Sequence, residues 1–520
     1  MQATPYPKRW WALGVLSLSL IVISLDNTIL NVAIPSMKED LGASSSELQW
    51  IVDAYMLVFA GLLLTIGSLG DRFGRKKVLT IGLAVFGTAS AAAAFMDDPN
   101  AIIACRAVMG IGGAAIMPAT LSIITATFPA DERPKAIAAW AAVSGLGIVI
   151  GPVAGGLLVE YADWSWVFLV NVPIVAAAIL LGRRLVPESK DPDPQRLDPR
   201  GALLSMAGLV ALVYAIIEGG GQRGWADPMV LAGFGAGAVL LGAFAAWELR
   251  CEHPMLDMRF FRNPRFGAAS AAIALAFSAL FGMMFLLTQY FQDVLDKSPL
   301  HAGLWALPTA AGMMMLSGPS AKLAARLGAK PVVSTGLALT AGGLAWLSTA
   351  TPDSGGAFLI ASQWLMGAGI GLAMAPATDS IMGSLPLARA SVGSAVNDTN
   401  RIVGGALGVA ILGSLLNSGY RGGMEQATHG LPAGAADAAR DSVGAAGVAA
   451  GQIGGAGGRA LDVAANAAFT DALSTALLVG AGFALAGALV ALAWLPSRAR
   501  PEAAVETAEP ARADEELLAA

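Results

Sequence analysis

Three charged residues stand inside long apolar stretches of the sequence, where water is scarce. Asp26 interrupts the run from Trp11 to Ile34, and Asp53 and Arg106 lie in two later runs of the same kind. An ionised carboxyl group at the centre of a membrane costs about 2.5–3.5 kcal/mol on insertion scales, so such residues usually serve a function. Because burial disfavours the charged form of an acid, Asp26 and Asp53 are candidate proton carriers.

A purely structural interpretation exists for both acids. Asp26 can accept hydrogen bonds from its polar neighbours Asn27, Thr28 and Asn31. Asp53 lies close enough to the end of its run to reach the membrane interface. We favour a functional role for each, because ionisable groups at this depth usually face a cavity.

The other charges within apolar runs have weaker claims. Arg106 stays protonated, and we expect it to neutralise a buried carboxylate or hold polar groups in a coupling role. Asp379, near the end of its run, is either a coupling residue or an ordinary interfacial charge. Asp398 and Arg401 are three residues apart and can pair on one helix face, so the structural interpretation is favoured there.

The composition is that of a membrane protein, in which charged residues are rare. Apolar residues make up 56% of the chain and charged residues 13%, and the mean hydropathy is +0.64. A soluble protein carries about 25% charged residues. Fourteen apolar runs are long enough to cross a membrane as helices, which predicts an all-α integral membrane protein. They are 11–34, 48–69, 78–97, 101–126, 136–159, 166–186, 200–218, 228–248, 266–291, 302–323, 331–350, 356–380, 395–416 and 470–494.

The basic residues predict the orientation, since Lys and Arg are kept on the cytoplasmic side. If both ends are cytoplasmic, most of the 32 Lys and Arg lie inside. The first run is far longer than the apolar core of a signal peptide, so we expect it to remain as a helix. We therefore expect a multi-pass protein of the cell membrane, in which Cys105 and Cys251 lie on opposite sides and stay unpaired.

Two internal matches divide the chain. "GSLGDRFGRKKVL" (Gly67–Leu79) aligns with "AKLAARLGAKPVV" (Ala321–Val333), and "MPATLSI" (Met117–Ile123) with "APATDSI" (Ala375–Ile381). Parallel repeats suit a transporter whose halves rock around a central site. We predict a six-helix bundle over 1–186, a linker with two inserted helices over 187–250, a second six-helix bundle over 251–496 and a cytoplasmic tail over 497–520.

Small residues and methionines add two further expectations. Spacing of four between small residues permits close helix approach, and it occurs twice, at Gly404 and Gly408 and in the run 136–159. The latter set comprises Gly147, Gly151, Pro152, Gly155 and Gly156. Methionines at 283, 284 and 313–315 would suit a broad-specificity pocket, but ordinary core packing is the favoured interpretation. We expect 418–468 to form a flexible outer loop, with short amphipathic helices around 435–448 as the alternative.

Several functional classes lack support in the sequence. The absence of a GK dipeptide excludes a Walker A phosphate loop, and no nucleophile-elbow motif occurs. The three histidines lack metal-ligand spacing. We therefore expect no enzyme, no bound cofactor or metal, and no nucleic-acid partner.

The motifs together resemble the major facilitator superfamily, and within it the fourteen-helix drug:proton antiporters. The residues that carry the resemblance include "LDNTILNVAIP" (Leu25–Pro35), "GSLGDRFGRKK" (Gly67–Lys77), "RAVMGIGGA" (Arg106–Ala114), "GLGIVIGPVAGG" (Gly145–Gly156), "WVFLVNVPI" (Trp166–Ile174) and "GSAVNDTNRIVGGALGVAILGS" (Gly393–Ser414). The chain departs from the family at Met109, where glutamine is usual.

The resemblance implies a fold of two pseudo-symmetric six-helix bundles plus two inserted helices. It implies proton-driven export of lipophilic, often cationic drugs, by a monomer in membrane lipid. Asp26 and Asp53 would serve proton coupling or drug recognition, and Arg106 a proton relay. A cytoplasmic latch that steadies the outward-open state would comprise Gly67, Asp71, Arg72, Gly74 and Arg75.

Our expected mechanism is that deprotonated Asp26 or Asp53 attracts the drug into a cavity, and that protonation from outside releases it. Asp26 is the acid on which this expectation mainly depends. Three alternatives remain open: an exporter of one antibiotic or metabolite, a proton symporter, which the Gly145–Gly156 motif disfavours, and a membrane sensor or scaffold without transport.

Overall fold

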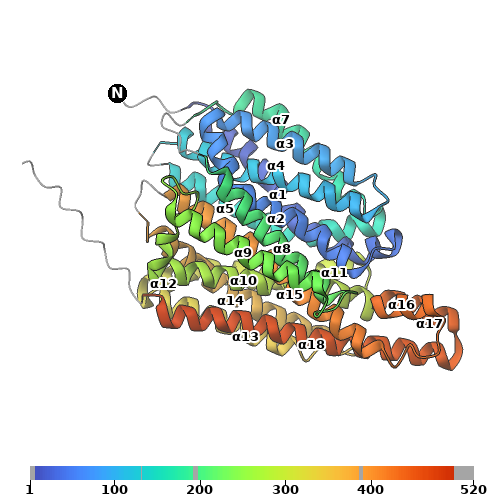
Figure 1. Ribbon diagram of the computed structural model, residues 1–520. Helices are drawn as coiled ribbons and strands as arrows, with labels where there is room; N and C mark the ends of the chain where they lie inside the picture. The colour runs from blue at the N-terminus through green and yellow to red at the C-terminus, as the bar shows by residue number, and fades with distance from the viewer. Residues whose placement is uncertain (1–5, 130–131, 191–196, 386–389, 497–520) are drawn as a thin grey trace, which may run out of the picture.

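A computed structural model of the protein describes residues 6–129, 132–190, 197–385 and 390–496. The regular elements in these ranges are helices that run side by side along one direction (Figure 1). Each of the fourteen predicted runs falls mainly on helical residues, of one helix or of two consecutive ones, and ten helical segments of the described residues are long and apolar enough to cross a membrane. The prediction of an all-α membrane protein is therefore confirmed.

The helices fall into two sets separated by a short connecting group. The first set comprises α1 (Arg9–Leu41), α2 (Ser45–Phe73), α3 (Arg75–Ala93), α4 (Pro99–Thr127), α5 (Arg133–Tyr161), α6 (Trp166–Leu169) and α7 (Asn171–Leu185). The connecting group comprises α8 (Pro199–Gly220), α9 (Pro228–Arg250) and η1 (Met258–Arg262). The second set comprises α10 (Pro264–Gln289), η2 (Tyr290–Val294), α11 (Pro299–Trp305), α12 (Leu307–Leu327), α13 (Ala329–Leu347), α14 (Gly356–Met382), α15 (Ala390–Met424), α16 (Ala433–Asp441), α17 (Val443–Ile453) and α18 (Gly455–Trp494).

Several helix starts follow from local sequence. Ser44 and Glu47 form a reciprocal capping box at the start of α2. Asp98 accepts the backbone N–H of Ala101 at 3.0 Å just before α4, whose first residue is a proline. A proline at the first helical position lacks only an N–H that would be unpaired in any case. The same arrangement of a polar cap followed by proline begins α8, α9 and α10.

The predicted repeat is visible in the packing of the two sets. In the first set α1 packs on α5, α2 on α4 and α3 on α4; in the second, α10 packs on α15, α12 on α14 and α13 on α14. The aligned glycines Gly74 and Gly328 both end a helix with positive φ, at 116° and 93°. The aligned prolines Pro118 and Pro376 both lie inside a helix. We call the first set the first half and the second set the second half.

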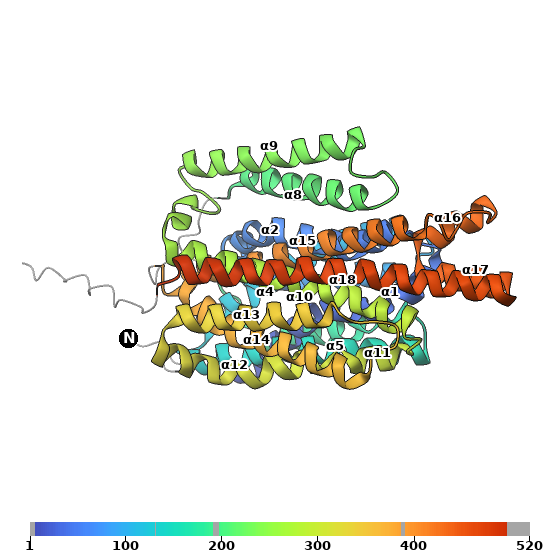
Figure 2. The same cartoon turned by 90° about the horizontal axis from the view of Figure 1, so that it is seen from below.

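The connecting helices lie outside the two halves. Figure 2 shows α8 and α9 as a hairpin on one side of the bundle, beside α2 and α15. Only α8 packs on α2 and α15, whereas α9 packs mainly on α8. Large apolar side chains of α9, such as Leu231 and Val239, are exposed. The hairpin is therefore an addition to the fold that packs, through α8, on one helix of each half.

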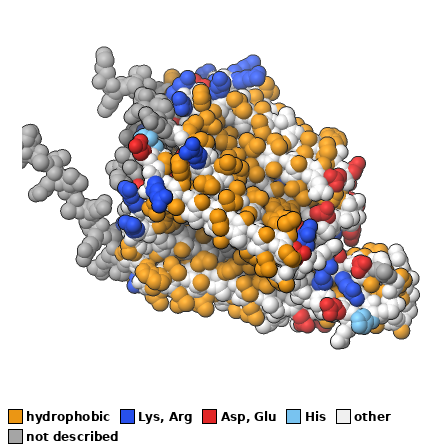
Figure 3. Space-filling view, in the orientation of Figure 1, with side chains coloured by type: hydrophobic (Ala, Val, Ile, Leu, Met, Phe, Trp, Pro, Cys, Tyr) orange, Lys and Arg blue, Asp and Glu red, His pale blue; other side chains and the backbone are white. Residues whose placement is uncertain are grey.

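The two ends of the molecule differ in charge. Figure 3 shows apolar side chains over the middle of one face, with basic side chains mostly near the end at which α1 begins and acidic side chains mostly along the opposite end, where α16 and α17 also lie. We call the end that carries Arg9 and Trp494 the inner end, and the end that carries α16 and α17 the outer end. These names follow the orientation that the basic residues predict.

The segment 418–468 differs from the favoured expectation. Instead of a flexible loop it is largely helical: α15 extends to Met424, α16 and α17 follow, and α18 starts at Gly455. Helix α16 is amphipathic, and buried alanines of α17 pack against α18. Small side chains allow these short helices to pack closely. A high content of glycine and alanine is also typical of flexible loops, so composition alone favoured the loop.

Candidate functional site

A buried ion pair lies at the centre of the first half. The Nη1 atom of Arg106 on α4 lies 2.5 Å from Oδ2 of Asp26 on α1. Both side chains are 1% exposed. Arg106 also donates from Nε to the backbone oxygen of Ile51 on α2, at 2.9 Å. The expected partnership of Arg106 with a buried carboxylate is thus present.

Three residues that the sequence did not single out complete this cluster. The Nδ2 atom of Asn171 on α7 lies 3.3 Å from Oδ1 of Asp26 and 3.2 Å from Oγ of Ser90 on α3. The guanidinium of Arg106 lies over the ring of Tyr55, 4.4 Å from its centroid. Cation–π contact and hydrogen bonds together compensate a buried charge. We call Asp26, Tyr55, Ser90, Arg106 and Asn171 the polar core.

The polar neighbours of Asp26 along α1 take other partners. Asn27 donates to the backbone oxygen of Ile23, Asn31 to that of Asn27, and Thr28 to backbone oxygens one turn back. The expected local bonds to Asp26 are therefore absent among these residues, because the aspartate side chain points instead to α4 and α7. A partner on another helix cannot be read from spacing along one helix.

Asp53 occupies a different environment. Its side chain is 0% exposed, and neither carboxyl oxygen has a hydrogen-bond partner in the described part of the chain. The interpretation that it reaches the membrane interface is therefore wrong. An ionised carboxylate without a donor is very costly in such a place, whereas a neutral carboxylic acid is much less so.

Helix spacing places Asp53 between the two halves. Four residues before it, Gln49 accepts a hydrogen bond from Ser414 of α15 at 3.4 Å. Three residues after it, the terminal methyl group of Met56 packs against Gly405 of the same helix. Residues spaced by three and four share a helix face, so Asp53 lies on the face of α2 that packs on α15.

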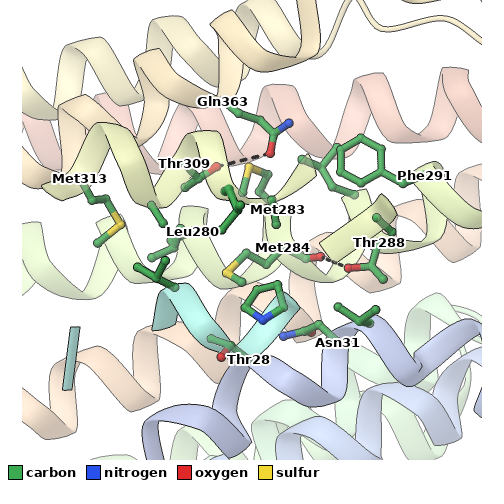
Figure 4. A pocket seen from close by; sticks show the side chains of 18 residues that line it. Thr28, Asn31, Leu280, Met283, Met284, Thr288, Phe291, Thr309, Met313 and Gln363 are labelled. Atoms are coloured by element: carbon green, nitrogen blue, oxygen red, sulfur yellow. Dashed lines mark hydrogen bonds between the residues drawn. The ribbon is translucent and has the colours of Figure 1, made fainter. Parts of the chain in front are cut away.

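A cavity opens between the halves, next to α1 and α5. It encloses about 610 Å³ that protein atoms do not occupy, including the part open to solvent. Figure 4 shows its labelled side chains converging from α1, α10, η2, α12 and α14. The lining residues are Thr28, Asn31, Val32, Val149, Pro152, Leu280, Met283, Met284, Leu287, Thr288, Phe291, Ala302, Ala306, Leu307, Thr309, Ala310, Met313 and Gln363. We call it the central pocket.

The chemistry of the central pocket is apolar with neutral polar groups. None of the residues that line it carries a formal charge, so neither Asp26 nor Asp53 reaches it in this state. The oxygen Oε1 of Gln363 accepts a hydrogen bond from Thr309 at 3.4 Å (Figure 4). Pockets of this kind bind lipophilic molecules and orient them with a few hydrogen bonds.

The methionines divide between two surroundings. Met283, Met284 and Met313 line the central pocket. Met283 is also part of the buried core, and Met284 and Met313 pack against that core, so core packing, the favoured expectation, holds for these three together with a place in the pocket. Met314 and Met315 follow on α12 but are 58% and 63% exposed. A helix turns about 100° per residue, so consecutive methionines cannot all face one cavity.

Helix α5 is held close to α1 by its glycines, as expected. A Cβ atom at Gly147 would lie 2.5 Å from Cβ of Ser24, one at Gly151 would overlap the hydroxyl of Thr28, and one at Gly155 would lie 2.7 Å from a backbone oxygen of α1. In the second half, Gly404 and Gly408 of α15 meet backbone oxygens of α10 in the same way. These contacts set the position of Thr28 and Pro152 in the central pocket.

The outer ends of the two halves are joined. Glu160 at the end of α5 accepts hydrogen bonds from the hydroxyl of Ser298 at 2.6 Å and from the backbone N–H of Leu300 at 2.9 Å. Gln292 donates to the backbone oxygen of Val32 at 3.0 Å. Gly156 packs directly on the backbone at Pro299. The described structure is therefore closed at its outer end.

Within the described part of the chain, the predicted latch contacts its own half and the linker. Asp71 and Arg75 form an ion pair at 2.7 Å, and Arg75 also donates to the backbone oxygen of Ser122. The backbone N–H groups of Arg75 and Lys76 bind Ser189 and Glu188 after α7. Gly67 packs on Pro118, Gly74 on the Glu188 carboxyl group, and Arg72 on the ring of Phe73.

A second inner-end contact involves the start of the chain. Arg9 donates to both carboxyl oxygens of Glu132, at 2.6 and 2.8 Å. These hydrogen bonds lower the pKa of Glu132 below its ordinary value. The charged pair fastens the start of α1 to the segment before α5 at the inner end.

The other charged residues that the sequence analysis named in apolar runs lie outside the polar core and the central pocket. Asp379 is exposed near the inner end of α14, away from the polar core and the central pocket. Asp398 and Arg401 do not form the expected ion pair among the described residues. Instead Asp398 accepts from Asn397 at 3.5 Å, and Arg401 lies over the ring of Phe277 and within 3.5 Å of Thr378. Cys105 and Cys251 are unpaired, as expected.

Comparisons with known proteins agree with this architecture. The family model described as Major Facilitator Superfamily matches residues 16–409. A multidrug efflux pump, LfrA of Mycolicibacterium smegmatis, is 36% identical over 93% of this chain and 95% of its own. The puromycin resistance protein pur8 of Streptomyces alboniger is 38% identical over 79% of this chain and 82% of its own. The methyl viologen resistance protein SmvA of Salmonella typhimurium is 36% identical over 82% of this chain and 85% of its own.

Solved structures share the fold at lower identity. A bacterial homologue of the human lysosomal transporter Spinster, inward-facing and occupied, matches with a TM-score of 0.67 and 19% identity, over 96% of this chain and all of that one. A D-xylose–proton symporter matches with a TM-score of 0.59 and 14% identity, over 94% of this chain and 98% of that one.

Proposed function

Because this chain belongs to the major facilitator superfamily of membrane transporters, we propose that it exports lipophilic drugs, including cationic ones, in exchange for protons. The observation that carries the proposal is the central pocket, which both halves line together with apolar and neutral polar groups. The relatives named for efflux of several drugs, and for resistance to puromycin and methyl viologen, support the same class of cargo.

Asp53 is the acid that we assign to the proton. It lies on the face of α2 that packs on α15, without a hydrogen-bond donor in the described residues. Closing the outer end removes water from this carboxyl group, so closure favours the neutral acid. Opening between α2 and α15 would return it to water, where it can exchange a proton with the outside.

Asp26 takes a different role in this proposal. Its charge is matched by Arg106 and Asn171, and both members of the ion pair are buried. The pair holds α1, α2, α4 and α7 together around one fixed arrangement of charge. Asp26 thus serves as the counter-ion of the polar core, and the earlier assignment of the titrating proton to Asp26 moves to Asp53.

The transport cycle follows from these two assignments. With the outer end closed and Asp53 protonated, a lipophilic molecule enters the central pocket from the inner side. Release of the proton to the cytoplasm leaves a carboxylate that the closed interface between α2 and α15 does not tolerate, so the outer end opens and the cargo leaves. A proton from outside then allows closure. Protonation shifts the equilibrium between the closed and open states because the proton binds to the two states with different affinities.

The setting completes the proposal. The chain lies in the cell membrane with both termini in the cytoplasm, works as a monomer and draws its energy from the proton gradient. The membrane potential contributes about 2.3 kcal/mol per charge per 100 mV to each inward proton. The proposed transport needs no bound cofactor.

An efflux assay in a host without other pumps tests this function. Cells that express the protein are loaded with cationic, neutral and anionic dyes, with and without an uncoupler. We expect faster loss of cationic and neutral lipophilic dyes than in empty cells, and no difference once the uncoupler removes the proton gradient. Efflux that survives the uncoupler, or dye accumulation in place of loss, would overturn the proposal. Efflux of one compound only would restrict it to a narrow-specificity exporter.

A further inference from the structure

The helical segment between α15 and α18 is an addition that the repeat does not need. In the first half, α5 ends at Tyr161 and the next helix starts at Trp166. The corresponding connection in the second half runs from Met424 to Gly455 and contains α16 and α17. Because the two halves share one packing plan, the bundle can be built without this segment. We call α16 and α17 the outer hairpin.

The outer hairpin is fixed to its own half by side chains of α15 and its neighbours. Arg421 donates to Oδ1 of Asp441 at 2.8 Å, and the hydroxyl of Tyr420 to the backbone oxygen of Ala439 at 2.9 Å. Arg440 donates to Thr428 at 2.6 Å. Helix α17 packs along α18. The outer hairpin therefore moves with the second half.

The same hairpin also reaches the first half, at the turn between α1 and α2. The hydroxyl of Ser45 donates to the backbone oxygen of Asp441 at 2.9 Å, and its backbone N–H lies 3.4 Å from Oδ2 of that aspartate. Lys38 donates to Ser45 at 2.6 Å and to the backbone oxygen of Asp441 at 3.4 Å. Asp441 thus joins the two halves.

Charge reinforces this contact from the second half. A small polar cavity beneath the outer hairpin is lined by Lys38, Asp293 and Asp441, together with Gln289, Asn417 and Tyr420. The ammonium group of Lys38 belongs to the first half, and both acids belong to the second. When the outer ends separate, Lys38 must leave both carboxylates.

From this geometry we infer that the outer hairpin is a gate, which Asp441 holds shut against Lys38 and Ser45 and which must release them in every transport cycle. This inference rests on the proposed alternation between closed and open outer ends. It assigns to Asp441 a positioning role in transport that the central pocket and Asp53 do not supply.

A reversible cross-link across the gate tests the inference. In a background of C105S and C251S, Ser45→Cys with Ser442→Cys places two thiols across the contact between Ser45 and Asp441. A reporter, Thr288→Cys in the central pocket, is labelled in intact cells by a membrane-impermeant maleimide. We expect oxidation of the 45–442 pair to reduce labelling at least tenfold and to stop dye efflux, and a reductant to restore both.

The matched control cross-links two helices of one half near the same end. A Cβ atom at Gly419 of α15 would lie 3.0 Å from Cβ of Ala472 of α18, so Gly419→Cys with Ala472→Cys fixes helices that move together. Its oxidation should leave labelling unchanged. Equal labelling in the oxidised 45–442 protein, or failure of that pair to cross-link, would overturn the gate. If the reduced protein is never labelled from outside, the proposed function fails, and the gate with it.

Loss of the carboxylate gives a second test without a cross-link. Asp441→Ala removes the bonds to Arg421 and to the backbone of Ser45, so the reporter should be labelled several-fold faster. Asp462→Ala removes an exposed acid of α18 near the same end and serves as the charge-matched control. Equal labelling rates for the two variants would contradict the assignment of Asp441.

Discussion

At the scale of single residues, two buried aspartates one helix apart have opposite surroundings. Asp26 has an arginine at 2.5 Å and an asparagine at 3.3 Å, whereas Asp53 has no donor in the described structure. A matched buried charge is a fixed feature of a fold, because removing either partner leaves the other unpaired. An unmatched buried carboxyl group is far less costly as the neutral acid than as the carboxylate, so it is a candidate for proton exchange once water reaches it.

The first prediction concerns the ion pair of the polar core. Asp26→Asn leaves Arg106 buried without a counter-ion, and Arg106→Gln leaves Asp26 buried without one. Breaking a buried pair costs about 3–5 kcal/mol, whereas removing both charges costs much less. We expect each single variant to unfold at lower temperature in detergent, and the double variant to regain part of the loss. Strictly additive losses in the double variant would show that the two charges do not depend on each other.

The second prediction concerns two methionines of one helix. Met313 lines the central pocket, and Met315 is 63% exposed two residues later. Met313→Trp should fill the pocket and weaken drug binding to the purified protein at least tenfold, which is about 1.4 kcal/mol. Met315→Trp should leave the dissociation constant, measured by fluorescence titration, within about twofold. Equal affinities would place the drug elsewhere.

At the scale of elements, close contact between α1 and α5 positions both sides of the central pocket. The contact depends on residues without a side chain at the helix crossing, since a single methyl group at Gly151 would overlap Thr28. Dense interiors transmit such a displacement, because they contain little free space. Both Thr28 and Pro152, which line the pocket, lie at this crossing.

The third prediction compares two glycines of α5. Gly151→Ala forces α1 and α5 apart, and overpacking of this kind typically costs about 1–3 kcal/mol. Gly145→Ala meets no atom within 4 Å and adds a better helix former. We expect the first variant to lose both thermal stability and dye efflux, and the second to keep both. A Gly151→Ala protein as stable and active as the original would refute the tight crossing.

Much of the architecture could be predicted from the sequence because it depends on patterns along the chain. Apolar length indicated the helices, the two internal matches indicated two similar halves, and the glycine spacing indicated a close helix contact of α5 without naming α1 as the partner. The contacts of Asp26 with Asn171 and of Arg106 with Tyr55 could not be found this way, because each depends on how distant helices pack. The outer hairpin was only the alternative expectation, because alanine and glycine suit both short helices and flexible loops.

At the scale of the whole molecule, the described structure is closed at the outer end and holds the central pocket between two similar halves. The closure combines contacts of Glu160, of Gln292 and of the outer hairpin with the packing of α2 on α15. Asp53 lies within that packing. Under the proposed function, opening of the outer end returns this carboxyl group to water, and its protonation is thereby coupled to the movement of cargo.

The fourth prediction tests this coupling most directly, by drug-induced proton movement in liposomes that contain the purified protein. Asparagine is neutral and similar in shape, so Asp53→Asn should fold, bind drug and stabilise the closed outer end, yet move no protons when drug is added. Asp53→Glu should retain proton movement. Asp379→Asn, which changes an exposed acid, should move protons at the same rate as the unmodified protein. Proton movement at the full rate in Asp53→Asn would contradict the central claim.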